Sequence, residues 1–242
     1  MASHHFFQAH DGQDLQSALS LDSDFSASEA DHRISNNLAI LASAVSIRAT
    51  EVAKRQRHLS SEEVSLLLGE ISAKVSTIAW LHRFLSQEPA AGRVDINDHL
   101  YRLGDTLLSA LSDPRRMKLV RTGAGACTVA VGDVVPICLI VTEVITNSLK
   151  YAHPTQVSGT IFVGCRAETD GSLVVQVADD GVGLPEGFDV MTDGGTGGRT
   201  VRALARQLQA EITFESRPIG LRVTLRVPSR GDRSRAAQPA QA

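Results

Sequence analysis

Three polar side chains share one face of a strongly apolar stretch between residues 134 and 152. Glu143, Asn147 and Lys150 are spaced four and three residues apart, so in a helix all three project from the same side. An amide oxygen can ligate a hydrated Mg²⁺, an ammonium can meet phosphate, and a carboxylate can hold a water or take a proton. The pattern therefore suits a magnesium–phosphate site. A solvated outer face is the alternative, although asparagine is an unusual choice for one.

An acidic turn with two glycines follows an apolar run further along the chain. Residues 179 to 185 read Asp-Asp-Gly-Val-Gly-Leu-Pro. Asp179, at the end of a strand, could accept a hydrogen bond from an exocyclic amine, while Gly181 and Gly183 would let the backbone approach a flat ligand. Asp-Gly is also an ordinary turn after a strand, so this motif alone leaves both readings open.

A cluster of glycines stands directly before a helical pattern. Residues 194 to 198 read Gly-Gly-Thr-Gly-Gly and are followed by Arg199, Arg202 and Arg206. Glycines before a helix N-terminus expose unpaired N–H groups that suit phosphate oxygens. The spacing is neither that of a P-loop nor that of a dinucleotide motif. A flexible linker would also be rich in glycine, but the helix that follows favours a phosphate site.

A histidine near the N-terminus lies on the polar side of a helical pattern. Residues 31 to 37 read Asp-His-Arg-Ile-Ser-Asn-Asn, and at roughly 100° per residue His32 and Asn36 project about 160° away from the apolar seam. That seam consists of Ile34, Leu38, Leu41, Val45 and Val52. An outward histidine is either a solvated surface residue or a reactive group, and the downstream motifs favour the second.

Two long helical stretches are expected to position this histidine. The first runs from about residue 26 to 57, and Ser60 or Ser61 with Glu63 begins the second. The seam of the second consists of Val64, Leu68, Ile71, Val75, Ile78, His82 and Leu85. Two helices joined by a few residues form an antiparallel hairpin. Because one hairpin buries little apolar surface, we expect two copies to form a four-helix bundle in a homodimer.

Residues 87 to 93 break the helical pattern and predict a domain boundary. The segments expected beyond it are helices at about 96–111, 134–152 and 200–208, a weak strand at 120–131, a glycine-rich loop at 180–198, and hairpins of 157–166 with 173–178 and of 211–215 with 221–227. Mixed helices and antiparallel strands predict an α/β sandwich. The whole chain would then be α+β, with a flexible arm at 1–25, the hairpin at 26–88, the sandwich at 95–228 and a disordered tail at 229–242.

Composition narrows the classes of function. The chain has 242 residues, 43% hydrophobic, with a net charge of -3 from 24 basic and 27 acidic residues. Nothing in this balance points to nucleic acid or an anionic membrane. No apolar run approaches the roughly 20 residues of a membrane span, and the N-terminus lacks a signal peptide, so we expect a cytoplasmic protein. Cys127, Cys138 and Cys165 are expected to be reduced core residues.

The order and spacing of these motifs resemble a known superfamily. The sequence Glu-x-x-x-Asn-x-x-Lys, then Asp-Asp-Gly-Val-Gly-Leu-Pro, then a Gly-x-Gly lid before a helix, resembles the ATP-binding domain shared by gyrase, heat-shock-ninety, histidine kinases and MutL. With Asp-His-Arg-Ile-Ser-Asn-Asn upstream, residues 26 to 228 resemble bacterial histidine kinases. The closest subgroup has a His-Arg-x-x-Asn-Asn phosphoacceptor box and is related to the HWE kinases.

This resemblance implies roles for the N-terminal box. His32 would attack the γ-phosphate of ATP through a ring nitrogen, and Asp31 would orient the imidazole or accept its proton. Arg33 would meet phosphate charge, and Asn36 would position a water or the incoming phosphoryl group.

The resemblance also implies an ATP–Mg²⁺ site in the sandwich. Asn147 would ligate Mg²⁺, Glu143 would act as base beside it, and Lys150 would contact phosphate. Asp179 would bind the adenine amino group. The glycines implied in binding are Gly181 and Gly183 in the adenine pocket and Gly195 and Gly197 at the lid hinge.

Two features depart from the family pattern. The lid helix usually carries Leu or Met where this chain has Thr196, Gly198 and Thr200, which weakens the apolar anchoring of the lid. The Trp-x-Glu element of the HWE kinases is missing, because the single tryptophan, Trp80, lies in the second helix of the hairpin. About 25 residues before the hairpin are too few to fold a sensory domain, so we expect either that a separate partner supplies the input or that the protein is constitutive.

The sequence therefore predicts a histidine kinase that phosphorylates itself on His32 and passes the phosphoryl group to a response-regulator receiver domain. A phosphotransfer adaptor with a vestigial ATP domain is the first alternative. The second is an ATP-driven conformational switch in which His32 is incidental.

Overall fold

The structure is a computed structural model, and it describes residues 58–85, 92–113, 115–123, 125–154 and 157–229, with some helical positions between 39 and 53. Asp31, His32, Arg33 and Asn36 lie outside the described residues. The described elements, in chain order, are α2 (Ser61–Leu85), β1 (Arg93–Asp95), α3 (Asn97–Leu111), β2 (Met117–Thr122), β3 (Thr128–Ala130), α4 (Val131–Tyr151), β4 (Gly159–Ala167), β5 (Leu173–Asp179), α5 (Val190–Asp193), α6 (Gly195–Gln207), β6 (Glu211–Ser216) and β7 (Leu221–Val227).

The main sheet has five strands in the order β2-β4-β5-β7-β6, and β1 pairs with β3 in a separate two-stranded ladder. The two hairpins predicted from the sequence, β4–β5 and β6–β7, are antiparallel as expected. The prediction of antiparallel strands alone is wrong at β2, which runs parallel to β4 with Met117 opposite Gly159. The reason is the connection: α4 crosses between the two strands and returns the chain in the same direction.

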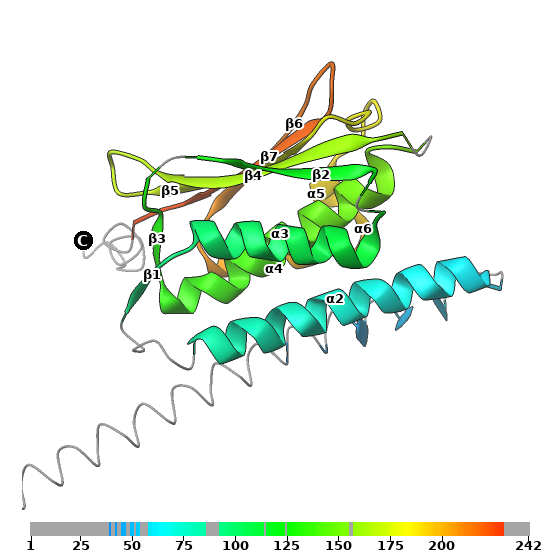
Figure 1. Cartoon of the computed structure of the whole chain (residues 1–242), viewed down its shortest axis with the longest axis horizontal. Helices are drawn as coiled ribbons and strands as arrows, with labels where there is room; N and C mark the ends of the chain where they lie inside the picture. Colours follow the sequence, from blue (N-terminus) through cyan, green and yellow to red (C-terminus); the bar gives the residue numbers. More distant parts are fainter. Residues whose placement is uncertain are drawn as a thin grey trace, which may run out of the picture.

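Helices α3, α4 and α6 cover one face of the sheet, and α2 lies on the far side of this helical layer (Figure 1). The centre of the core is α4, whose Ile137, Ile140 and Ile145 are fully buried, against Ile161 of β4 and Leu204 of α6. Each such side chain contributes roughly 1.5–3 kcal/mol by leaving water. The α/β sandwich predicted from the sequence is confirmed.

Among the described helices, α4 has the length and apolar composition of a membrane span, with a mean hydropathy of 1.5 over its most apolar window. However, 89% of that window is buried inside the molecule. Pro136 is tolerated because it lies near the beginning of the helix, where backbone N–H groups have no intrahelical partner. The apolar composition of α4 is therefore accounted for by its position between the sheet and α2.

Helix α2 begins with a reciprocal cap. The Glu63 backbone N–H donates to Ser60 Oγ at 3.1 Å, and the Ser60 N–H donates to Glu63 Oε2 at 2.9 Å. The C-terminal part of the helix packs on the core through Ala73, Ile78 and Trp80.

Part of the apolar seam of α2 instead remains open to solvent. Val64, Leu68 and Val75 remain 39%, 59% and 48% exposed. Apolar side chains at these regular helical positions are available for another helix.

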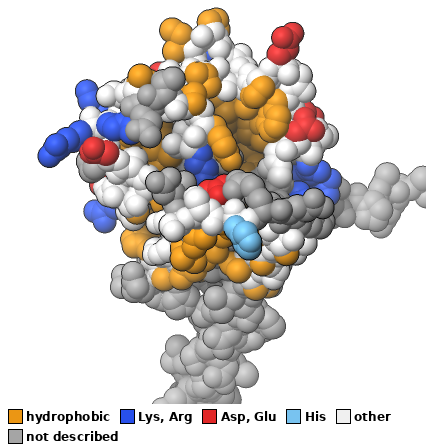
Figure 2. Space-filling model, turned by 90° about the vertical axis from the view of Figure 1, so that its right-hand side faces the viewer, with side chains coloured by type: hydrophobic (Ala, Val, Ile, Leu, Met, Phe, Trp, Pro, Cys, Tyr) orange, Lys and Arg blue, Asp and Glu red, His pale blue; other side chains and the backbone are white. Residues whose placement is uncertain are grey.

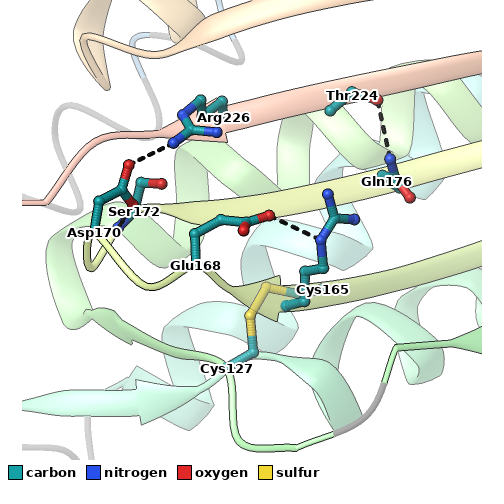
Figure 3. A network of polar contacts seen from close by, with 9 residues as sticks. Cys127, Cys165, Glu168, Asp170, Ser172, Gln176, Thr224 and Arg226 are labelled. Atoms are coloured by element: carbon teal, nitrogen blue, oxygen red, sulfur yellow. Dashed lines mark hydrogen bonds and ion pairs between the residues drawn. A yellow bond between two sulfur atoms is a disulfide. The ribbon is translucent and has the colours of Figure 1, made fainter.

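The cysteine prediction is wrong for two of the three residues. Cys127 and Cys165 form a disulfide with a Cα–Cα distance of 6.0 Å (Figure 3). Cys138 is free and buried. Burial raises the pKa of the Cys138 thiol to about 12. The pair forms because the backbone N–H of Cys127 donates to Asp95 and that of Cys165 donates to Asn97, which holds both chain segments beside the start of α3.

The expected loop at 180–198 also differs from the structure. It contains the short helix α5, and α6 begins at Gly195, within the glycine cluster and not after it. Gly194 donates its N–H to the Val190 carbonyl at 3.1 Å, and side chains at Gly194 or Gly198 would collide with that carbonyl. The glycines therefore allow the two helices to approach closely.

Candidate functional site

A cavity of about 590 Å³ lies between α4, the β5 and β7 strands, the segment leading into α6, and α2. Its volume is in the range of small-ligand sites. The sequence-predicted residues that line it are Glu143, Asn147, Lys150, Asp179, Gly183, Gly195 and Gly197. Gly181 does not line the cavity itself, but a side chain there would collide with Ala152, which does. The structure thus brings together three motifs that are separated in the sequence.

One end of the cavity is formed by α4 and the beginning of α6. Glu143 is buried, whereas Asn147 and Lys150 are partly exposed on the same face of α4. A Cβ built on Gly197 would lie 3.3 Å from Glu143 Oε2 and 3.7 Å from Asn147 Nδ2. The first turn of α6 therefore lies directly against the polar face of α4, because glycine leaves room there.

The other end of the cavity holds a fixed carboxylate. Asp179 Oδ2 accepts a hydrogen bond from Ser148 Oγ at 2.7 Å, and Oδ1 accepts from the backbone N–H groups of Gly181 and Leu221, both at 3.1 Å. A buried carboxylate with several donors is held in one orientation. Sequence reasoning missed Ser148, although its position next to Asn147 on α4 could have drawn attention to it.

A turn after Asp179 approaches the cavity through its second glycine. Gly183 has φ +73° and lines the cavity, and a Cβ on it would lie 2.5 Å from Ser216 Oγ. Ser216 Oγ also accepts the Leu184 N–H at 3.0 Å. Only glycine satisfies both the left-handed backbone and the close approach.

Apolar side chains complete the cavity wall. Tyr151, Val182 and Phe188 line it and remain exposed at 65%, 66% and 38%. Figure 2 shows hydrophobic side chains gathered on this end of the molecule around basic and acidic side chains. A cavity with apolar walls, one fixed acceptor and a polar end suits a ligand with a flat base and an anionic tail.

A second acid, Asp180, joins the end of α4 to the sheet. His153 Nε2 lies 3.0 Å from Asp180 Oδ1, which also accepts the Thr160 N–H at 2.7 Å. Partial burial acts to raise the pKa of Asp180, but the hydrogen bonds from Thr160 and His153 outweigh it and hold the pKa below its usual value. Sequence reasoning did not find His153 or this contact.

Replacing Asp180 by asparagine is expected to destabilise the protein at neutral pH by roughly 1 kcal/mol, because a partly exposed charge-assisted contact is lost. Since the pKa of Asp180 in the folded protein lies below its ordinary value of 3.8, the contribution is complete above that pH and disappears as the pH falls further. Thermal unfolding at about pH 7 and about pH 3 tests this, with exposed Asp105→Asn as the control. An equal difference at both pH values would contradict the expectation.

Comparisons with known proteins agree with this geometry. Residues 29–111 match the histidine kinase family HisKA_2, and residues 132–231 match the family of histidine kinase-, DNA gyrase B- and HSP90-like ATPases. The chain belongs to the histidine kinases. The resemblance inferred from the sequence is thereby confirmed, including the ATP-binding domain in the C-terminal half of this histidine kinase.

This chain is 33% identical over 143 residues to "Blue-light-activated histidine kinase 2" of Erythrobacter litoralis (strain HTCC2594). The match covers 57% of this chain but 41% of the relative, so the chain spans less than half of that protein's length.

Two solved structures from the same genus have a similar fold. One is the histidine kinase domain of a blue-light-activated histidine kinase from Erythrobacter litoralis, with a TM-score of 0.66 and 24% identity, covering 88% of this chain and 98% of that chain. The other, a longer chain of that kinase, has a TM-score of 0.65 at 24% identity and covers 87% of this chain and 61% of that one. At this identity the likeness concerns the fold alone.

Proposed function

We propose that this histidine kinase phosphorylates itself on His32 with ATP and passes the phosphoryl group to an aspartate of a response-regulator receiver domain. The observation that carries the proposal is that Glu143, Asn147 and Asp179 line one cavity together with the first turn of α6. The upstream match to HisKA_2 supports a phosphoacceptor histidine in the N-terminal part.

The residues around the cavity suit ATP together with Mg²⁺. Among the described residues, no three His, Cys, Asp or Glu side chains lie close enough to hold a metal. Mg²⁺ does not need such a cluster, because one amide oxygen, phosphate oxygens and waters can complete its shell. Asn147 would supply that oxygen, and the ion would neutralise phosphate charge.

The adenine and phosphate groups of ATP would occupy opposite ends of the cavity. Asp179 would accept a hydrogen bond from the adenine amino group, with Gly181 and Gly183 shaping the pocket. Lys150 would contact phosphate, and Gly195 and Gly197 would let the beginning of α6 close over it.

In the proposed reaction a ring nitrogen of His32 forms a bond to the γ-phosphorus of ATP. The bond between that phosphorus and the β–γ bridging oxygen breaks, and ADP leaves. Asp31 orients the imidazole or takes its proton, Glu143 is the base in the ATP domain, and Arg33 offsets phosphate charge. Asn36, one turn after His32, positions a water or the incoming phosphoryl group.

The exposed seam of α2 supports a homodimer. Val64, Leu68 and Val75 are too exposed to contribute to the core of one chain, and a second hairpin would cover them in a four-helix bundle. The domains would be the segments 26–88 and 95–228, and the cytoplasm is the expected location. The net charge of -3 gives no reason to propose a nucleic acid or an anionic membrane as a partner.

Incubation of the purified protein with γ-labelled ATP and Mg²⁺ tests the function. Label on the protein that is labile in acid and stable in base is the expected result, because a phosphoramidate has this chemistry. The altered lid, with Thr196, Gly198 and Thr200, supports one rival, the phosphotransfer adaptor. An adaptor would take no label from ATP but would accept phosphoryl from a phosphorylated receiver domain. ATP hydrolysis without label would instead indicate a conformational switch.

Replacing Asp179 by asparagine is expected to weaken ATP binding by ~10- to 100-fold, the effect of losing a hydrogen bond to a charged acceptor. Asparagine keeps the shape and one oxygen for the Gly181 and Leu221 N–H groups. Its amide nitrogen, however, would face the adenine amino group as a second donor. Binding of inosine triphosphate, which has a carbonyl at that position, should fall much less.

The matched control is Asp180→Asn, one residue further on, which should keep the wild-type preference for ATP over inosine triphosphate. Titration with a fluorescent nucleotide and competition by both triphosphates measures these affinities. An unchanged preference in Asp179→Asn would contradict the adenine role.

A further inference from the structure

The buried carboxylate of Glu143 has a partner on a different domain segment. Lys74 of α2 reaches across to α4, and its Nζ lies 2.6 Å from Glu143 Oε1. The two side chains are only 16% and 7% exposed. No sequence motif of the ATP site includes Lys74, which comes from the helix that follows the phosphoacceptor segment.

The negative charge of Glu143 faces one basic side chain. Among the described residues, Lys74 is the ion-pair partner of this carboxylate. A buried carboxylate without a partner is costly, and removing one member of such a pair is much more damaging than losing an exposed ion pair. Lys74 is therefore the side chain that compensates the carboxylate at the cavity wall.

The ion pair also fixes the direction of the carboxylate. Lys74 contacts Oε1, whereas Oε2 faces Gly197 in the first turn of α6. A Cβ built on Gly197 would lie only 3.3 Å from Oε2. The oxygen that Lys74 does not contact is thus directed toward the part of the cavity next to α6. Both Lys74 and Glu143 line that cavity.

Lys74 stands on the firmly docked part of α2. Thr77 and Ile78, three and four residues further along, are buried at 5% and 7% exposure, and Thr77 Oγ1 donates to the Ala73 carbonyl at 2.8 Å. The packing of α2 against the core therefore determines where the Lys74 ammonium lies. Lys74 differs in this from a surface lysine, whose ammonium moves freely in solvent.

We propose that Lys74 is a positioning residue for the phosphoryl-transfer step, acting through Glu143. It holds Oε1 so that Oε2 faces the phosphate end of the cavity, and it does so only while α2 is docked on α4. This inference rests on the proposed kinase function. It makes the orientation of the base depend on the helical hairpin that carries the phosphoacceptor.

The test compares Lys74→Met, Lys74→Arg and the control Lys118→Met, in which an exposed lysine of β2 undergoes the same change. Initial rates of acid-labile labelling are measured against ATP concentration. For Lys74→Met we expect kcat to fall by ~10- to 100-fold, no more than the lower limit of a general base contribution, because the base is displaced and not removed, while KM for ATP changes by less than about threefold. Lys74→Arg should recover most of kcat, and Lys118→Met should match wild type.

Since an unpaired Glu143 could destabilise the fold, the change is repeated with Glu143→Gln, which removes the buried charge. If Lys74 acts through Glu143, then Lys74→Met added to Glu143→Gln lowers kcat no further than Glu143→Gln alone. Thermal unfolding of each variant accompanies the rates.

Several results would overturn the inference. Additive losses in the double variant would mean that Lys74 acts independently of Glu143. An increase in KM alone would make Lys74 a phosphate contact, and a faster rate in Lys74→Met would make the pair an inhibitory clamp. If the wild type is labelled and Lys74→Met is labelled at the same rate, only this inference is refuted. If the wild type itself takes no label, the proposed function is refuted, and the inference with it.

Discussion

Replacing Asn147 by alanine is expected to abolish labelling of the protein by ATP, with a loss of at least ~100-fold in rate. Asn147 is the one side-chain amide among the described residues that line the cavity, between Glu143 and Lys150 on α4. Without its oxygen, Mg²⁺ loses its protein ligand and the charge of the triphosphate is poorly neutralised, which is worth several kcal/mol in phosphoryl transfer.

A comparison of binding with and without Mg²⁺ separates this effect from misfolding. Wild-type protein should bind ATP more tightly with Mg²⁺ than with a chelator, and Asn147→Ala should lose most of that difference while its affinity in chelator stays similar. The mass in solution should remain that of a dimer for both proteins, because Asn147 lies away from the exposed seam of α2. Full labelling of Asn147→Ala would rule out the metal role.

Replacing His32 by alanine is expected to remove all acid-labile label while leaving ATP binding unchanged. The imidazole of His32 is the proposed nucleophile, so its removal takes away the ring nitrogen that would bond to phosphorus. The described residues that line the cavity come from α2 and from positions after 140, apart from Val45, which is 13 residues after His32.

The chain has eight histidines, so the site of labelling needs its own control. His58→Ala, which alters an exposed histidine in the turn before α2, should retain wild-type label. The tryptic peptide of residues 1–33 contains four histidines, so fragmentation of that labelled peptide should place the phosphoryl group on His32. Label that persists in His32→Ala would identify another histidine as the acceptor and contradict the proposed phosphoacceptor box.

Patterns that act over a few residues were readable from the sequence. The four-and-three spacing of Glu143, Asn147 and Lys150 does place them along one side of α4, because helix geometry alone determines which side chains share a face. Ser60 and Glu63 form the expected cap for the same reason. The β4–β5 and β6–β7 hairpins follow from short turns between strands. The resemblance to histidine kinases also came from the order of motifs.

Contacts between distant segments were decided only by the tertiary structure. The sequence did not reveal the parallel pairing of β2 with β4, the Cys127–Cys165 disulfide, or the Lys74–Glu143 ion pair. Periodicity tells which face of an element is buried but not which partner covers it. The glycine cluster at 194–198 shows the same limit: its residues begin α6 because α5 packs closely against them. Partner choice depends on how all elements pack at once, and no local rule contains that information.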